Sequence, residues 1–428
     1  MRKNILLYSL LLFSFIRLFS QDSLSLADAI RLGLENNYQI QISGKNLEIT
    51  KNNNSWGIAG AFPVITAGLN QNNLYINDTS NISSNNLNPN LNLRWTLFNG
   101  FNVFITKSKL EFLEDLSEGN TAIIVENTIQ GIIMAYYYAL LQMENLVVVE
   151  EVMKLSRDRY RYILTKKELG SAVTFDVLQA QNNYLSDSSN YLLQQINFQN
   201  ALRNLNLILA EPVYKDYLLI TDFSIEDRDF MLTDLISVMG SNNKTLLNQF
   251  INQEILKKDL LLQKTALYPN ITLNSGYNYT KSWNNIDPYP SITSDSYNYY
   301  ANFTLSLTLF NGYRIRKGIQ NAKIQEKIGE LQIREMQHRL SNQVTTTYEL
   351  YNVRKQLKKV ADEIIKSAQL NLQISEEKFK SGSINSFNFR DVQLIYLNTA
   401  LGQLRAIYNL IESQTDLLRL TGGIIAEY

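Results

Sequence analysis

Residues 90–100 read NLNLRWTLFNG, and this stretch decides the fold. Leucine and tryptophan side chains alternate here with asparagine, arginine and threonine, up to Leu97. Successive side chains of a β-strand point to opposite faces, so the alternation predicts a strand with one apolar and one polar face. Gly100 permits a sharp change of direction, and Asn99 can cap a helix that follows. The stretch therefore predicts a strand over about 90–98 that leads directly into a helix.

The end of this stretch occurs twice in the chain, and so do the motifs around it. The matching pairs are Phe62-Pro63 with Tyr268-Pro269, Thr96–Gly100 with Thr308–Gly312, and Gly170-Ser171 with Gly382-Ser383. The two prolines are 206 residues apart, and Gly100 and Gly312 are 212 apart. Because the motifs keep their order, we predict two tandem helix–β-hairpin–helix repeats, 21–211 and 230–421. A connector (212–229) joins them, and a tail (422–428) follows.

Each repeat is predicted to carry two strands, at about 63–76 and 90–98 and at about 269–281 and 299–310. The polar stretches between them, Asn77–Pro89 and Ser282–Asn298, are predicted to be loops without regular structure. A soluble half-buried sheet would show the same alternation. Strands of about ten residues suit a tilted crossing of a hydrocarbon layer, and aromatic rings near their ends suit its interface. These rings are Tyr75, Trp95, Tyr277, Tyr279, Tyr299 and Tyr300.

Four strands cannot close a barrel, because the smallest membrane barrels have about eight strands. Open sheet edges are not tolerated in lipid. The chain is therefore expected to oligomerise. A dimer would supply eight strands and a trimer twelve.

The rest of the chain is predicted to be helical, in helices far longer than usual. No proline lies between Gly100 and Gly170, a stretch of about 90–100 Å as one helix. Pro63 and Pro269 mark the helix ends before the first strand of each repeat, and Asn311-Gly312 corresponds to Asn99-Gly100. Helical hairpin tips are expected at about 166–174 and 380–386. A soluble coiled coil would explain the helices but not the strands.

Residues 1–20 resemble an export signal, with Arg2-Lys3 followed by a short apolar run. The chain has no cysteine, which excludes thiolate chemistry, and its 40 basic residues balance 40 acidic ones, which gives no footprint for nucleic acid. The single histidine, His338, lies in a polar, helix-forming stretch and is interpreted as a solvated helix residue. No enzyme activity, catalytic residue, cofactor or metal site is predicted.

The duplication, the two Leu-Phe-Asn-Gly strand ends and the tips GSAVTFDVLQAQ (170–181) and GSINSFNFRDVQ (382–393) resemble the TolC-type outer-membrane efflux proteins. The resemblance implies a membrane α+β fold, with a homotrimeric 12-stranded β-barrel in the outer membrane of a Gram-negative bacterium. A long α-helical barrel would continue it through the periplasm. The implied partners are outer-membrane lipid, a periplasmic adaptor (membrane fusion protein) and an inner-membrane RND or ABC transporter.

The same resemblance implies two sets of site residues. A pore constriction would involve Asp391, Asn388 and, on the first tip, Asp176; helix capping near a turn is the alternative. Adaptor docking is expected at the tip residues Gly170, Ser171, Gly382 and Ser383. The alternative role of the two glycines is only to reverse the chain.

The predicted function is a passive exit duct in a tripartite efflux or type I secretion system. A free-standing porin is one alternative, although it leaves the long helices without a purpose. A structural coiled-coil protein of the envelope is the other. The sequence does not reveal the cargo.

Overall fold

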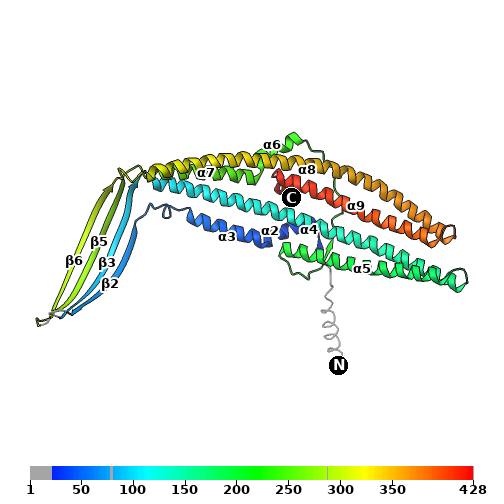
Figure 1. The fold of residues 1–428 in the computed structure, drawn as a ribbon, viewed down its shortest axis with the longest axis horizontal. Helices are drawn as coiled ribbons and strands as arrows, with labels where there is room; N and C mark the ends of the chain where they lie inside the picture. The colour runs from blue at the N-terminus through cyan, green and yellow to red at the C-terminus, as the bar shows by residue number, and fades with distance from the viewer. Residues whose placement is uncertain (1–21, 78–80, 287, 428) are drawn as a thin grey trace, which may run out of the picture. The chain divides into compact units, whose positions relative to one another are not determined.

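The computed structural model describes residues 22–77, 81–286 and 288–427 (Figure 1). The signal predicted over 1–20 lies outside the described residues. The chain divides into two compact units. A helical unit comprises the chain up to Ile42, Ala122–Asn243 and the chain from Arg339 onward, and a sheet unit comprises Ser43–Thr121 and Lys244–His338.

The sheet unit contains four long antiparallel strands in the order β2-β3-β5-β6 (Figure 1). They are β2 (Val64–Asn77), β3 (Asn81–Asn99), β5 (Asn270–Ile286) and β6 (Ile292–Ser306). The register places Ala67, Leu91, Tyr277 and Tyr299 in one row across the sheet. Since residues directly opposite one another share a face, the alternation along one strand fixes the faces of all four.

The strands are longer than the sequence analysis predicted. Much of the two predicted loops is strand, because β3 begins at Asn81, β5 continues to Ile286 and β6 begins at Ile292. The fourth strand also ends earlier than predicted, at Ser306 rather than 310. Strand pairing uses backbone N–H and C=O groups, which asparagine and serine supply as well as apolar residues do. The aligned partner strand therefore overrides the low strand propensity of these residues.

Helices adjoin the strands within the sheet unit. They are α3 (Tyr38–Asn53), α7 (Lys244–Thr265) and the first parts of α4 (Asn102–Glu168) and α8 (Arg314–Lys380). Polar contacts link α7 to both long helices. Lys109 of α4 pairs with Asp259 at 2.5 Å, and the Gln253 amide donates to the Glu326 carbonyl of α8 at 3.1 Å. The long helices thus leave the sheet with α7 packed against them.

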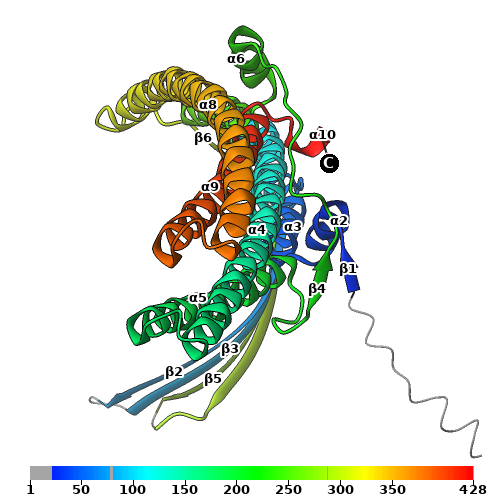
Figure 2. The same cartoon turned by 90° about the vertical axis from the view of Figure 1, so that its right-hand side faces the viewer.

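The helical unit holds α2 (Leu26–Asn36), α5 (Thr174–Leu209), α6 (Leu232–Asn242), α9 (Ser386–Leu420) and α10 (Ile424–Glu427), with the later parts of α4 and α8. Two three-residue strands, β1 (Asp22–Leu24) and β4 (Tyr217–Leu219), pair in parallel (Figure 2). β4 lies in the predicted connector, where strands of three residues are too short for alternation to reveal.

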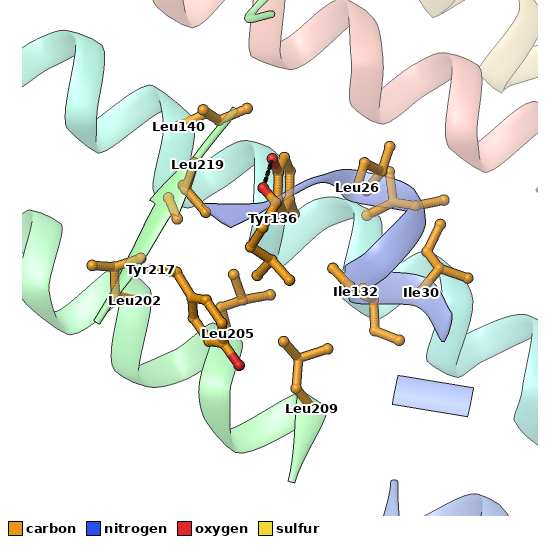
Figure 3. Packing of buried hydrophobic residues seen from close by; sticks show 14 of the residues in the cluster. Leu26, Ile30, Ile132, Tyr136, Leu140, Leu202, Leu205, Leu209, Tyr217 and Leu219 are labelled. Atoms are coloured by element: carbon orange, nitrogen blue, oxygen red, sulfur yellow. Dashed lines mark hydrogen bonds between the residues drawn. The ribbon is translucent and has the colours of Figure 1, made fainter. Parts of the chain in front are cut away.

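A hydrophobic core joins α2, α4, α5 and this strand pair (Figure 3). Tyr136 of α4 is fully buried, and its hydroxyl lies 2.8 Å from the Leu24 carbonyl and 2.9 Å from the Thr221 hydroxyl. The surrounding side chains include Leu26, Ile30, Ile132, Leu140, Leu202, Leu205, Leu209, Tyr217 and Leu219. The core therefore fastens the start of the described chain and the connector to the long helix.

A second core joins the two helical hairpins, α4–α5 and α8–α9. Its members are Val152, Ile163, Val177, Ala180, Leu372, Phe379, Phe389, Tyr396 and Ala400. Spacing by three and four residues predicts a seam along α9 through Leu394, Leu397, Leu401, Leu404, Tyr408, Ile411, Thr415 and Leu418. Leu394, however, is 37% exposed. The buried line instead begins at Phe389, Gln393 and Tyr396, and it meets the predicted positions at Leu404, Ile411 and Thr415.

Candidate functional site

The sheet has one polar and one apolar face over much of its length. On the polar face, Asn90 lies opposite Asn278, which lies opposite Asn298. Their amides bond along and across the strands: the Asn92 amide donates to Asn90 at 2.8 Å, and the Asn278 amide to Asn298 at 3.1 Å. This face is a lattice of neutral hydrogen-bonding groups, suited to contact with water.

The opposite face carries a broad apolar belt. Along β5 the belt runs from Ile271 to Tyr279, nine residues, which matches the roughly 9–11 residues that a tilted strand needs to cross a bilayer. Its side chains are largely exposed, such as Leu69 at 67%, Phe303 at 71% and Tyr299 at 81%. Exposed apolar surface of this extent marks an interaction site, and the strand length suits lipid.

The strands continue past the belt. Lys281 lies opposite Asp295 on the belt's side of the sheet, and the Lys281 ammonium lies 5.3 Å from the centre of the Trp283 ring. Beyond this level both faces are rich in asparagine and serine, up to the hairpin ends. Only the part of the sheet near the helices is therefore apolar enough for a hydrocarbon layer.

The sheet is open at both sides. In the described part of the chain, β2 pairs only with β3 and β6 only with β5. Each outer strand therefore presents a row of backbone groups without a strand partner in this chain. Such edges pair readily with another strand.

The predicted junction residues lie where strands meet helices. Pro63 directly precedes β2 and Pro269 directly precedes β5. Asn99 is the last residue of β3, and Gly100 follows it with φ of 67°. A Cβ on Gly100 would lie 2.7 Å from the Thr265 carbonyl, so this turn has no room for a side chain.

Asn311 and Gly312 lie in the short stretch between β6 and α8. The Asn311 side chain accepts a hydrogen bond from the Ile315 N–H at 3.3 Å, near the start of α8. Gly312 and Tyr313 both have positive φ, 64° and 63°, as Gly100 and Phe101 do at the other junction. The two junctions share this turn conformation.

Gly170 and Gly382 reverse the chain at the two hairpin tips, with φ of 75° and 79°. At the first tip the Ser171 N–H donates to the Lys166 carbonyl, and at the second the Ser383 N–H donates to Lys378, both at 2.8 Å. These bonds satisfy carbonyls at the ends of α4 and α8. Nothing would touch a Cβ on either glycine, so both turns are open to solvent in this chain.

Comparison with known proteins identifies the fold. Residues 235–423 match the family model described as "Outer membrane efflux protein". This part of the chain, which covers most of the second predicted repeat, is therefore similar to outer membrane efflux proteins. No match was found among curated proteins.

Solved structures of outer-membrane channels share the fold of this chain. The CmeC channel of Campylobacter jejuni is 16% identical, with a TM-score of 0.76 over 93% of this chain and 85% of that chain. The open-state MtrE channel of Neisseria gonorrhoeae is 14% identical, with a TM-score of 0.72 over 93% and 89%. VceC of Vibrio cholerae is 12% identical, with a TM-score of 0.71 over 93% and 96%.

The predicted constriction residues lie at the starts of α5 and α9. Asp176 is half-buried in the first turn of α5, while Asn388 and Asp391 are exposed on α9. The rings of Phe175 and Phe387 stack at 6.4 Å, which brings the first turns of the two helices together. Asn388 also takes part in capping, since its N–H donates to the Asn385 side chain at 2.9 Å.

A buried polar cluster below the tips was missed by the sequence analysis. Arg390 of α9 binds both carboxylate oxygens of Asp187 of α5, at 2.6 and 2.8 Å, and its guanidinium lies 3.1 Å from the Ser156 hydroxyl of α4. The Asp187 side chain is only 4% exposed. The one signal in the sequence was Arg390 itself, a charged residue in the second tip segment that could pair with a neighbouring acid.

Arg159 adds a second cation to this cluster. Burial, with a smaller contribution from the nearby Arg390, lowers its pKa to about 10, while Asp187 opposes the change. Its guanidinium donates to the Ser386 carbonyl at 3.3 Å. One buried carboxylate thus serves two arginines from different hairpins.

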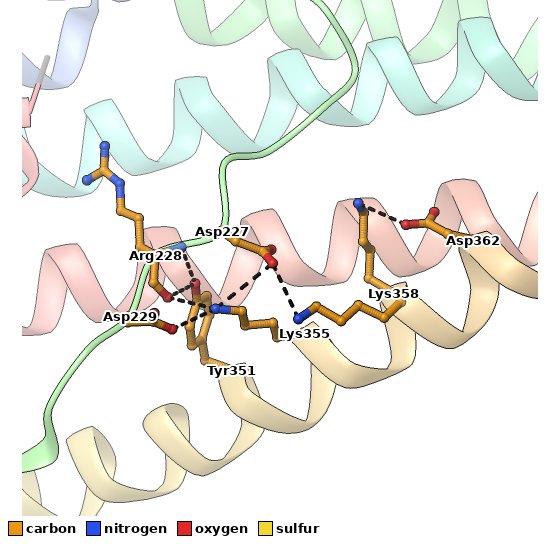
Figure 4. Close-up of polar contacts among 8 residues, drawn as sticks. Asp227, Arg228, Asp229, Tyr351, Lys355, Lys358 and Asp362 are labelled. Carbon is orange, nitrogen blue, oxygen red and sulfur yellow. Dashed lines mark hydrogen bonds and ion pairs between the residues drawn. The ribbon is translucent and has the colours of Figure 1, made fainter.

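A further polar cluster fastens the connector to α8 (Figure 4). Tyr351 is 1% exposed, and its hydroxyl donates to the Arg228 carbonyl at 2.8 Å. Lys355 pairs with Asp229 at 2.8 Å, and this hydrogen bond raises the pKa of Lys355. The arrangement is a structural clamp rather than a site for chemistry.

No group of metal-ligating side chains was found among residues 22–77, 81–286 and 288–427. Within the same residues, one helix, α4, is long and apolar enough to cross a membrane by length and composition alone. Its apolar window is 44% buried within the protein. Most of the buried apolar side chains of α4 belong to the two cores described above, so packing accounts for much of its apolar character.

Proposed function

We propose that this efflux protein is one subunit of a homotrimeric outer-membrane channel, the passive exit duct of a tripartite efflux or secretion system. The observation that carries the proposal is the four-stranded sheet, with an apolar belt on one face, a neutral polar lattice on the other and two open edges. This combination suits a sheet that faces lipid outside and water inside.

Closure requires other copies of the chain. In lipid each backbone group must be hydrogen-bonded, so β6 of one subunit would pair with β2 of the next. Three copies give twelve strands, whereas two copies would give the minimum of about eight. The long helices favour the trimer, because they too must enclose a lumen that is continuous with the barrel.

The helices α4 and α8 have 67 residues each, about 100 Å at 1.5 Å per residue. Helices of this length would extend the duct through the periplasm. There the tips at Gly170-Ser171 and Gly382-Ser383 would meet a membrane fusion protein, which links the channel to an RND or ABC transporter. A free-standing porin would need no such helices.

The channel is tested by purifying the protein from outer membranes and recording its conductance in planar bilayers, with subunits counted by native mass spectrometry. We expect discrete channels and a trimeric mass. A structural envelope protein would give no conductance. An eight-stranded dimer would be recognised by its native mass, which would be that of two subunits.

The adaptor contact is tested by photocrosslinking from Ser171 or Ser383 in cells that co-express a periplasmic adaptor. An adduct at either position is expected, and the exposed residue Asn200 on α5 serves as a control. Adducts at Asn200 but at neither tip would argue against docking there.

Asp391, with Asp176, is proposed to narrow and gate the periplasmic entrance. A ring of carboxylates in a narrow pore favours cations. Asp391→Ala is therefore expected to lower cation selectivity and to raise the conductance of the resting channel. Helix capping alone would leave both values unchanged.

A further inference from the structure

The strands of the sheet are almost free of charge. Their described residues include only three ionisable side chains with a formal charge at neutral pH: Arg94, Lys281 and Asp295. Lys281 and Asp295 lie opposite one another on the belt's side of the sheet, so they offset each other there. Arg94 has no such counterpart.

Arg94 lies on the polar face. The register places it opposite Val64 of β2 and Asn274 of β5, and its Nε donates to the Asn274 side-chain oxygen at 3.3 Å. Asn92 and Thr96 flank it on the same face of β3. The side chain is exposed, and these neighbours on the polar face are all uncharged.

We propose that Arg94 sets the charge preference of the barrel lumen. The inference rests on the proposed function, because three copies are needed to bring three arginines into one ring. A guanidinium stays protonated at any physiological pH, and rings of arginine select for anions. The uncharged lattice around it holds no carboxylate that would cancel this field. The ring therefore attracts anions and anionic groups of the cargo.

The alternative role of Arg94 is a cross-strand tie to Asn274 without influence on solutes. The two roles can be distinguished by their dependence on salt. The field of a charge acts through space and is screened by salt, whereas a hydrogen bond to Asn274 acts only locally. Arg94→Lys keeps the charge and alters the geometry, while Arg94→Gln keeps a hydrogen-bonding group and removes the charge. Lys281→Gln removes the other strand cation and serves as the matched control.

The absence of cysteine from the chain makes the local potential measurable. Asn302→Cys would lie on the polar face, opposite Asn274 and two strands from Arg94, about 10 Å away. Its rates of reaction with an anionic and a cationic thiol reagent of equal size are compared in the trimer in outer membranes. Ala301→Cys, the next residue on β6, points to the belt face and should react with neither.

At about 0.01 M ionic strength, where the Debye length is about 30 Å, Arg94→Gln should lower the anionic-to-cationic rate ratio at Asn302→Cys by about threefold. The difference should vanish near 1 M salt. Arg94→Lys and Lys281→Gln should leave the ratio unchanged.

Two failures are distinguishable. If Asn302→Cys reacts with both reagents and Arg94→Gln does not change their ratio at low salt, the arginine ring is refuted and the barrel stands. An Arg94→Lys variant that behaves like Arg94→Gln would refute it as well. If Asn302→Cys is inert and Ala301→Cys reacts, the faces are reversed and the proposed barrel fails with the ring.

Discussion

Removal of the buried carboxylate below the tips should loosen the contact between the two helical hairpins. In Asp187→Asn the side chain keeps its shape, but Arg390 loses its only bidentate charge partner in the cluster. Breaking a buried ion pair on one side costs about 3–5 kcal/mol, because the other charge stays desolvated. The Arg390 side chain is 14% exposed, so solvent relieves little of this cost.

We expect Asp187→Asn to lower the free energy of opening the hairpins by about 3 kcal/mol. The cost lies at the low end of the range because the asparagine amide oxygen still accepts a hydrogen bond. This corresponds to an increase on the order of 100-fold in the opening equilibrium of the hairpins. Arg159 enlarges the effect, because Asp187 also supports its charge. The double variant Asp187→Asn with Arg390→Gln should recover part of the loss, because the buried charge of Arg390 is then removed and only Arg159 still lacks the support of Asp187.

Native-state hydrogen exchange, read by mass spectrometry on peptides from α5 and the start of α9, measures this opening. Asp158→Asn is the control, because Asp158 is 65% exposed and its pairing with Arg157 should contribute little. Exchange of the Asp187→Asn tip peptides within twofold of the unmodified protein would refute the reasoning. So would a double variant that opens more readily than the single one.

Three further outcomes are expected. Leu91→Lys places a charge within the apolar belt and should lower the stability of the barrel by about 2–4 kcal/mol. The effect is measured as a loss of trimer from outer membranes. The control is Asn90→Lys, on the polar face next to Leu91, which should assemble normally. Gly170→Ala forces a side chain into a turn with φ of 75° and should lower stability by about 1 kcal/mol in denaturant titration, while Ser171→Ala should change it by less than about 0.5. Burial raises the pKa of Asp416, so the unfolded chain loses this proton at lower pH than the folded protein does. The stability of the folded protein therefore falls as pH rises between the pKa of the unfolded chain and that of the folded one. Asp416→Asn should therefore be more stable than the unmodified protein at pH 7. The two proteins should be equally stable near about pH 3, where the Asp416 carboxyl is protonated and both side chains are uncharged. Equal midpoints of denaturant unfolding at pH 7 would contradict this.

Much of the fold could be predicted from local patterns in the sequence. Alternation around Leu91 lies within β3, and Gly170 and Gly382 have the positive φ that a reversal needs. The strand and the two turns depend on residues close together in the chain. One sequence is enough to reveal them. The predicted resemblance to outer-membrane efflux proteins was confirmed by the family-model match over residues 235–423.

Features that depend on a distant partner were missed. The polar ends of β3 and β5 are strands because each has a partner in register, such as Ser84 with Asn284, and not because of their own propensity. Asp187 and Arg390 are 203 residues apart. Asp187 on its own resembles any solvated helix residue, since the helix pattern around it is polar and the burial comes from three packed helices.

The apolar belt lies near one end of the strands, so the junction end and the hairpin end of the sheet differ in polarity. On β5 the apolar row begins at Ile271, one residue after the strand starts and two after Pro269, so lipid contact would begin almost directly at the helix junctions. It ends at Tyr279, and β5 then continues to Ile286 with polar residues on both faces. A two-sided polar hairpin needs water on both sides, whereas the junction end leads into helices whose cores are packed against protein. In the proposed channel, the hairpin ends would therefore lie outside the cell and the junctions on the periplasmic side, because the reverse orientation would draw the helices through the lipid.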